Sequence, residues 1–109
     1  MPLWAVTPEK LADAVKRIVA LAHPRRIILF GSRAHDAAGP DSDVDLLVVE
    51  DVVPNRYTET VRLRRALAGV MMPIDLLVIG ERDFQAASQW PGSVYRVAQQ
   101  EGRVLYDAA

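Results

Sequence analysis

The sequence predicts a small α/β domain in which strands alternate with amphipathic helices. Three apolar runs have the length and composition of buried strands, at residues 26–30, 44–49 and 73–79. Other segments carry apolar residues at helical spacing and begin and end at typical capping residues. With 109 residues the chain has the length of one domain, so we expect a single domain over residues 1–109.

Composition excludes several functional classes. The net charge is −1, which provides no broad basic surface, so nucleic acid is not expected as the main partner. The chain has no cysteine, which excludes disulfides and thiolate metal sites. No apolar run approaches the ~20 residues of a membrane span, and the first residues do not resemble a signal peptide. We therefore expect a cytoplasmic protein with no membrane partner.

The first helix is predicted over residues 8–22. Thr7 is a hydroxyl N-cap, and the proline that follows it suits the first helical position because no N–H is needed there. The helix should end before Pro24, since the residue preceding a proline disfavours the helical region. The first strand is then expected at residues 26–30.

A glycine and a serine, Gly31 and Ser32, follow this strand directly. The next segment, residues 33–38, is polar and contains alanine, so it is predicted to form a short helical turn. A helix that begins directly after Ser32 would point unpaired backbone N–H groups at the end of the strand. Such a turn, together with the serine hydroxyl, is suited to bind an anion.

The remaining elements follow from the same signals of capping and periodicity. Asn55 and Ser93 are the predicted N-caps of two helices, and glycines are expected to end them. In order, these elements are a strand at 44–49, a helix at 56–68, a strand at 73–79, a weakly helical segment at 81–89, a helix at 94–101 and a short strand at 103–106.

Three aspartates lie on or beside the two later strands. Asp43 and Asp45 are two residues apart at the start of an apolar run, so their side chains share one face of the strand. Asp75 interrupts the next apolar strand, and such local inconsistency often indicates a site. Neighbouring carboxylates repel unless a cation lies between them. If the two strands are neighbours, the three carboxylates should converge on one divalent metal site.

The chemistry expected of this site follows from its ligand type. Ligation by aspartate oxygens alone suits Mg²⁺ or Mn²⁺ that also binds substrate phosphates. Asp43 and Asp45 would hold the metal, and Ser32 with nearby backbone amides would hold a triphosphate. Asp75 would be a further ligand and a base for an attacking hydroxyl in an in-line displacement.

The combination of these motifs resembles the nucleotidyltransferase superfamily related to DNA polymerase beta. Its parts are Gly31-Ser32, ten intervening residues, Asp43-Val-Asp45, and an isolated Asp75 on a later apolar strand. The small size and the Gly-Ser-Arg-Ala start are similar to the minimal nucleotidyltransferases, or MNT proteins, many of which are antitoxins to HEPN-domain toxins. The likeness extends to the closing residues 101–106.

The resemblance implies a nucleotidyltransferase fold, with a small mixed sheet flanked by helices. It also implies metal-dependent transfer of a nucleoside monophosphate, usually AMP from ATP, to a tyrosine of a HEPN-domain partner. The family's roles fall on Gly31 and Ser32 for nucleotide binding and on Asp43, Asp45 and Asp75 for catalysis and metal binding. The arginine at 33 matches one common in these proteins and is expected at the phosphates.

Alternatives remain open for function and for individual residues. The domain could neutralise a partner by masking it, without catalysis, or act on a small molecule, and a homo- or hetero-oligomer is compatible with either. Asp41 could replace Asp45 as the partner of Asp43, and Asp75 could instead pair with an arginine of the preceding helix. His35 could touch nucleotide or simply be solvated. An EF-hand is rejected, because the loop lacks the required glycine and glutamate.

Overall fold

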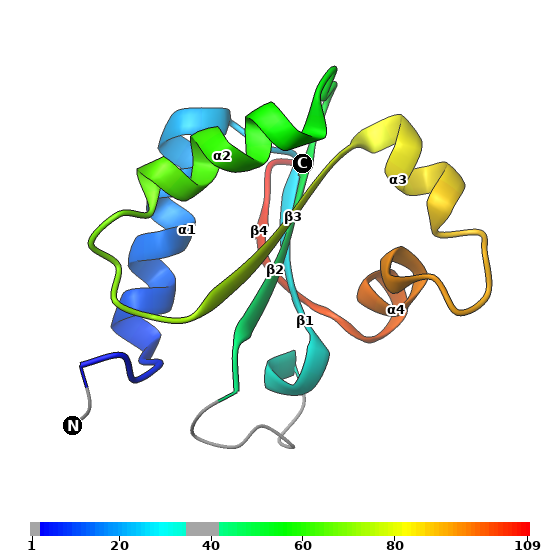
Figure 1. Ribbon diagram of the computed structural model, residues 1–109. Coiled ribbons are helices and arrows are strands. Elements are labelled where there is room, and N and C mark those ends of the chain that lie inside the picture. Colours follow the sequence, from blue (N-terminus) through cyan, green and yellow to red (C-terminus); the bar gives the residue numbers. More distant parts are fainter. Residues whose placement is uncertain (1–2, 35–41) are drawn as a thin grey trace.

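The computed structural model describes residues 3–34 and 42–109, which form a four-stranded sheet with helices on both faces (Figure 1). The fold is therefore the mixed α/β arrangement predicted. No helix in the described part of the chain is long and apolar enough to cross a membrane. In chain order the elements are α1 (Pro8–Ala22), β1 (Arg26–Phe30), the 3₁₀ turn η1 (Gly31–Ala34), β2 (Val44–Glu50), α2 (Arg56–Ala66), β3 (Ile74–Gly80), α3 (Glu81–Ala87), α4 (Val94–Glu101) and β4 (Arg103–Asp107).

The sheet has the strand order β3-β2-β1-β4 and is mixed. Strand β2 pairs antiparallel with β1 and parallel with β3, and β4 pairs antiparallel with β1. The residues of β2 from Leu46 to Glu50 are all buried, as expected of an inner strand covered on both faces. Strands β3 and β4 form the two edges.

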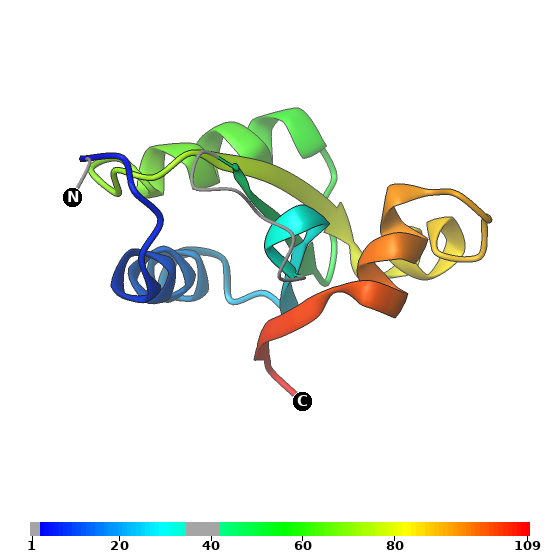
Figure 2. The same ribbon diagram turned by 90° about the horizontal axis from the view of Figure 1, so that it is seen from below.

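Each face of the sheet has its own hydrophobic core. On one face, α1 and α2 pack through residues such as Ile18 and Leu63 against Leu46 and Val48. On the other face, Phe84 of α3 and residues of α4 pack against the alternate strand positions. Figure 2 shows the two helical layers on opposite sides of the strands. Strand alternation thus divides β2 between two cores, and this decides which face each polar residue of the strand reaches.

The predicted helix caps are confirmed. The side chains of Thr7, Asn55 and Ser93 each accept a hydrogen bond from the backbone N–H three residues later, at 3.1, 3.0 and 3.0 Å. Each bond satisfies an N–H that the helix itself leaves unpaired, and the loss of such a cap typically costs ~1 kcal/mol. The starts of α1, α2 and α4 are therefore set locally by the sequence.

The end of α2 differs from the prediction by two residues. The helix ends at Ala66 rather than at residue 68. Arg17 of α1 donates from Nη1 to the carbonyl oxygens of Ala66 and Ala68, at 3.3 and 2.7 Å. A side chain from another helix therefore satisfies carbonyls at this terminus, which periodicity within α2 does not reveal.

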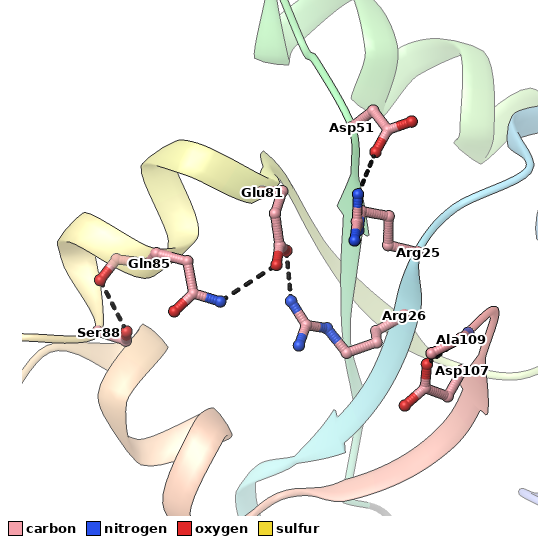
Figure 3. A network of polar contacts seen from close by, with 8 residues as sticks. All are labelled: Arg25, Arg26, Asp51, Glu81, Gln85, Ser88, Asp107 and Ala109. Carbon is pink, nitrogen blue, oxygen red and sulfur yellow. Dashed lines mark hydrogen bonds and ion pairs between the residues drawn. The ribbon is translucent and has the colours of Figure 1, made fainter.

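The end of the sheet where β1 begins carries a network of paired charges (Figure 3). Arg26 forms an ion pair with Glu81, the first residue of α3, and Arg25 pairs with Asp51 at 2.8 Å. Gln85 donates from its amide to Glu81 at 3.1 Å. Because these charged groups satisfy one another across several elements, we regard this end as structural.

Glu50 is a buried acid at the same end of β2. Its residue is 8% exposed, and burial is the main reason that its pKa rises to about 8. A hydrogen bond with Glu59 adds to this rise, while the Arg62 guanidinium opposes it. Two hydrogen bonds from Arg62, at 2.7 and 2.9 Å, keep Glu59 ionised and are the largest cause of its lowered pKa. At neutral pH Glu50 therefore keeps its proton.

We expect this buried acid to make the protein less stable as the pH rises from about 4.5 to 8. The folded state retains the Glu50 proton over this range and the unfolded state has released it, so the free energy of unfolding falls by up to ~1.4 kcal/mol per pH unit. Glu50→Gln should reduce this slope in urea unfolding experiments, whereas the exposed-site control Glu9→Gln should retain it. Equal slopes in wild type and Glu50→Gln would contradict this account.

Candidate active site

Two of the three predicted aspartates lie side by side on neighbouring strands. In the parallel pairing of β2 with β3, Asp45 is the direct partner of Asp75. Direct partners project to the same face, and here it is the face that α3 and α4 cover farther along the strands. Asp45 is half-buried and Asp75 is exposed. The two carboxylates thus occupy a solvent-accessible position at one end of the sheet.

The glycine turn packs directly against this pair. Phe30, the last residue of β1, is the antiparallel partner of Asp45, and Gly31 follows it with φ +73°. A Cβ atom at Gly31 would lie 2.2 Å from Oδ2 of Asp45. Two separate features therefore require glycine at position 31: the left-handed backbone conformation and the close approach of the Asp45 carboxylate.

Electrostatics at the site raise the pKa of Asp45. Burial is the main cause, followed by the negative charges of Asp75 and Asp43 and a hydrogen bond with Asp75. Each cause disfavours the ionised form of Asp45, and a cation placed between the carboxylates would offset the repulsion by attracting both of them. Electrostatics at the site therefore favour binding of a positively charged group.

Asp43 lies near the pair but outside the paired strands. It is exposed just before β2 begins, and its charge acts on Asp45. Within residues 3–34 and 42–109, no three or more His, Cys, Asp or Glu side chains are already arranged around one metal position. The structure thus brings Asp45 and Asp75 together, and metal binding by all three carboxylates stays a prediction. Because Asp43 lies outside the strand pairing, its backbone is not held in register with β3.

The pair nevertheless fits a hard divalent cation. Mg²⁺ keeps several waters and is usually bound by one or two carboxylates together with substrate phosphates, rather than by a cage made of protein alone. Asp45 and Asp75 supply such carboxylates beside a turn suited to phosphate. The donor set contains only oxygen, which also suits Mn²⁺.

The turn itself is a single 3₁₀ turn, η1, in which Ser32 is exposed. Arg33 is predicted to contact phosphate, but here its Nε and Nη2 donate to the carbonyl oxygen of Ser42, at 3.0 and 2.8 Å. Arg33 thereby ties the turn to the residue just before Asp43. Its role at the phosphates stays a prediction. His35 and Asp41 lie outside the described residues.

The alternative in which Asp75 is a structural acid is not favoured. Among the ion pairs between described residues, none joins Asp75 to an arginine of α2. Arg64 of α2 instead donates to the carbonyl oxygen of Ile74, at 3.4 Å. A small hollow formed by Trp4, Arg64 and Ile74 lies at this edge. No sequence signal indicated it, because its walls come from three distant segments.

Comparisons with known proteins identify the family and support the fold. Residues 8–107 match the model of the nucleotidyltransferase domain. A protein of Methanocaldococcus jannaschii, named "Putative protein adenylyltransferase MJ0604", is 35% identical over 82 residues, which cover 75% of this chain and 78% of that protein. The crystal structure of a "putative nucleotidyltransferase" from Sulfolobus solfataricus has a similar fold, with a TM-score of 0.67 and 18% identity over 92% of this chain and 79% of that one. On these matches, the chain belongs to the nucleotidyltransferase domain family.

Proposed function

We propose that this nucleotidyltransferase transfers AMP from ATP to a hydroxyl group of a protein. The observation that carries the proposal is the Asp45–Asp75 pair packed against the Gly31 turn. A nucleotidyltransferase domain uses a nucleoside triphosphate and a divalent metal ion, and we propose ATP with Mg²⁺ or Mn²⁺ as the specific pair. The name of the archaeal relative, a protein adenylyltransferase, supports a protein as the acceptor.

The reaction is an in-line displacement at the α-phosphorus. The acceptor hydroxyl oxygen forms a bond to the α-phosphorus while the bond to the bridging α–β oxygen breaks, and pyrophosphate leaves. Ser32 and the backbone amides of its turn bind the departing phosphates. Asp75, the more exposed member of the pair, accepts the hydroxyl proton directly or through water. A bound divalent metal would supply positive charge to the α-phosphate and both carboxylates.

The acceptor that we propose is a tyrosine of a HEPN-domain partner, with the chain acting as its antitoxin. Asp75 is exposed, so the hydroxyl of a partner protein can reach the carboxylate pair from solvent. In the masking alternative the same partner would be bound and neutralised without transfer. Both proposals place the chain in the cytoplasm.

Replacing either carboxylate of the pair should abolish transfer without unfolding the protein. We expect Asp45→Asn and Asp75→Asn each to lower the rate of AMP transfer to a purified HEPN-domain protein by at least about a hundredfold, because metal-assisted charge stabilisation contributes several kcal/mol. Label transfer from α-labelled ATP measures this rate. The exposed-acid control Asp83→Asn should retain full activity. If Asp45→Asn neutralised the partner as well as wild type does, masking would be the better account.

Adding a methyl group at Gly31 should disrupt the site through contact with Asp45. Gly31→Ala places Cβ 2.2 Å from the Asp45 carboxylate, so we expect at least a tenfold loss of nucleotide affinity, measured by calorimetry with Mg²⁺. Gly69→Ala is the matched control, because Gly69 has φ +89° and nothing lies within 4 Å of its added Cβ. Both variants carry ~1–2 kcal/mol of backbone strain. Equal nucleotide affinity in the two variants would show that contact with Asp45 is unimportant.

A further inference from the structure

A small hollow lies at the edge of the sheet, next to the start of β3. It is a hollow of about 260 Å³ between Trp4 of the N-terminal segment, Arg64 of α2, and Pro73 and Ile74 at the start of β3. Sites for whole small molecules usually measure ~300–1,000 Å³. This hollow is therefore suited to one side chain and is too small for a nucleotide.

The position of the hollow relative to the turn suggests what it binds. Strand β2 lies between β1, which leads into the Gly31 turn, and β3, which forms the edge. Figures 1 and 2 show η1 and the start of β3 on opposite sides of the start of β2. In an in-line displacement the entering and leaving oxygens lie on opposite sides of the phosphorus. With pyrophosphate held at the turn, an acceptor that approaches from the β3 side would satisfy this geometry, and the hollow lies at that edge of the sheet.

The side chain of Lys10 holds two walls of the hollow together. The Lys10 ammonium donates to the carbonyl oxygens of Leu3, Ala5 and Met71, at 2.7, 2.8 and 2.7 Å. These bonds fasten the segment that carries Trp4 to the loop that precedes β3. Trp4 is 58% exposed although its backbone neighbours are fixed, so its indole ring is presented to solvent at a defined place.

The chemistry of the hollow favours an apolar or aromatic side chain with an acidic neighbour. Its floor is apolar, formed by Leu67, Val70 and Met72, and Trp4 supplies an aromatic wall. Arg64 is exposed and is the charged residue of the lining, in which no acidic side chain takes part. Its guanidinium makes a long hydrogen bond of 3.4 Å to the backbone. An acidic group on the partner would therefore be attracted here.

Strand alternation links the hollow to the carboxylates. Ile74 faces the hollow, whereas the next residue, Asp75, projects to the other face of the sheet. An extended acceptor segment that crosses this edge alternates in the same way. If the hydroxyl-bearing residue of the acceptor lies over Asp75, the next residue of the acceptor points to the face of the sheet that carries the hollow.

We propose that the Trp4–Arg64 hollow anchors the protein acceptor by binding an apolar or aromatic side chain next to the residue that receives AMP. The inference rests on the proposed function, since it assumes transfer to a protein hydroxyl. Trp4 and Arg64 are positioning residues for the acceptor and leave nucleotide binding to the turn and the carboxylates. Acceptors with Asp or Glu beside the anchor side chain are preferred, because Arg64 attracts them.

Two blocked peptides test the proposal with the full chain, Mg²⁺ and ATP. One contains Asp-Leu-Tyr and the other Lys-Gly-Tyr, and pyrophosphate release measures kcat and KM for each. We expect wild type to prefer the first peptide at least tenfold. Trp4→Ala and Arg64→Ala should raise its KM at least fivefold with little change in kcat or in ATP affinity, and Trp4→Phe should restore KM.

Matched controls and a second readout separate the possible failures. Trp90→Ala and Arg65→Ala remove an exposed tryptophan and an exposed arginine that lie outside the hollow, and should leave KM unchanged. In Trp90→Phe, Trp4 is the remaining tryptophan of the chain, so quenching of its emission reports peptide binding without chemistry. Binding of the first peptide without transfer would count against the proposed function and leave the hollow as a peptide-binding site only.

Three results would overturn the anchor itself. The first is an unchanged KM in Trp4→Ala, and the second is a loss of ATP affinity in that variant, which would assign the hollow to the nucleotide. The third is an absence of both transfer and quenching with the first peptide while the protein binds ATP and Mg²⁺. Circular dichroism confirms that each variant is folded, which the exposure of Trp4 and Arg64 leads us to expect.

Discussion

The site depends on an unfavourable contact that the rest of the fold enforces. Parallel pairing of β2 with β3 brings Asp45 and Asp75 together, and their mutual repulsion is one cause of the raised pKa of Asp45. Apolar residues farther along both strands, buried on both faces of the sheet, fix this register. Hydrophobic burial along the strands thus offsets the electrostatic repulsion between the two carboxylates, and a bound cation would relieve that repulsion.

Acidic side chains are neutralised at one end of the sheet and lie next to one another at the other end. At the start of β1, Arg26 is paired with Glu81, and the buried Glu50 avoids a negative charge by keeping its proton. At the other end, Asp45 and Asp75 have no arginine partner among the ion pairs of the described residues. Asp45 is half-buried beside two other carboxylates, and both conditions disfavour its ionised form. This contrast, more than the number of acids, distinguishes the site from the structural network.

Local signals predicted the fold well, and non-local contacts account for the errors. Caps at Thr7, Asn55 and Ser93 act within one helical turn, so the sequence reveals them. That β2 and β3 are neighbours was only a condition of the predicted site, and the structure supplies it by parallel pairing of the two strands. The end of α2 did not, because Arg17 of another helix satisfies its carbonyls. Strand periodicity does not decide whether Asp43, which precedes the paired strand, shares a metal with Asp45 and Asp75, so its role as a ligand stays a prediction.

The two sides of the reaction are built from different parts of the chain. On the leaving-group side, Gly31, Ser32 and Asp45 come from adjacent strands joined by one connection, and the tight fit of Gly31 against Asp45 leaves little freedom for substitution. On the acceptor side, Trp4, Arg64 and Ile74 come from three distant segments that meet at an exposed sheet edge. Side chains there can change without disturbing the carboxylate pair. If the proposed roles hold, such a domain can keep one nucleotide chemistry while its acceptor changes, because the turn lies between β1 and β2 and the hollow lies at the start of β3.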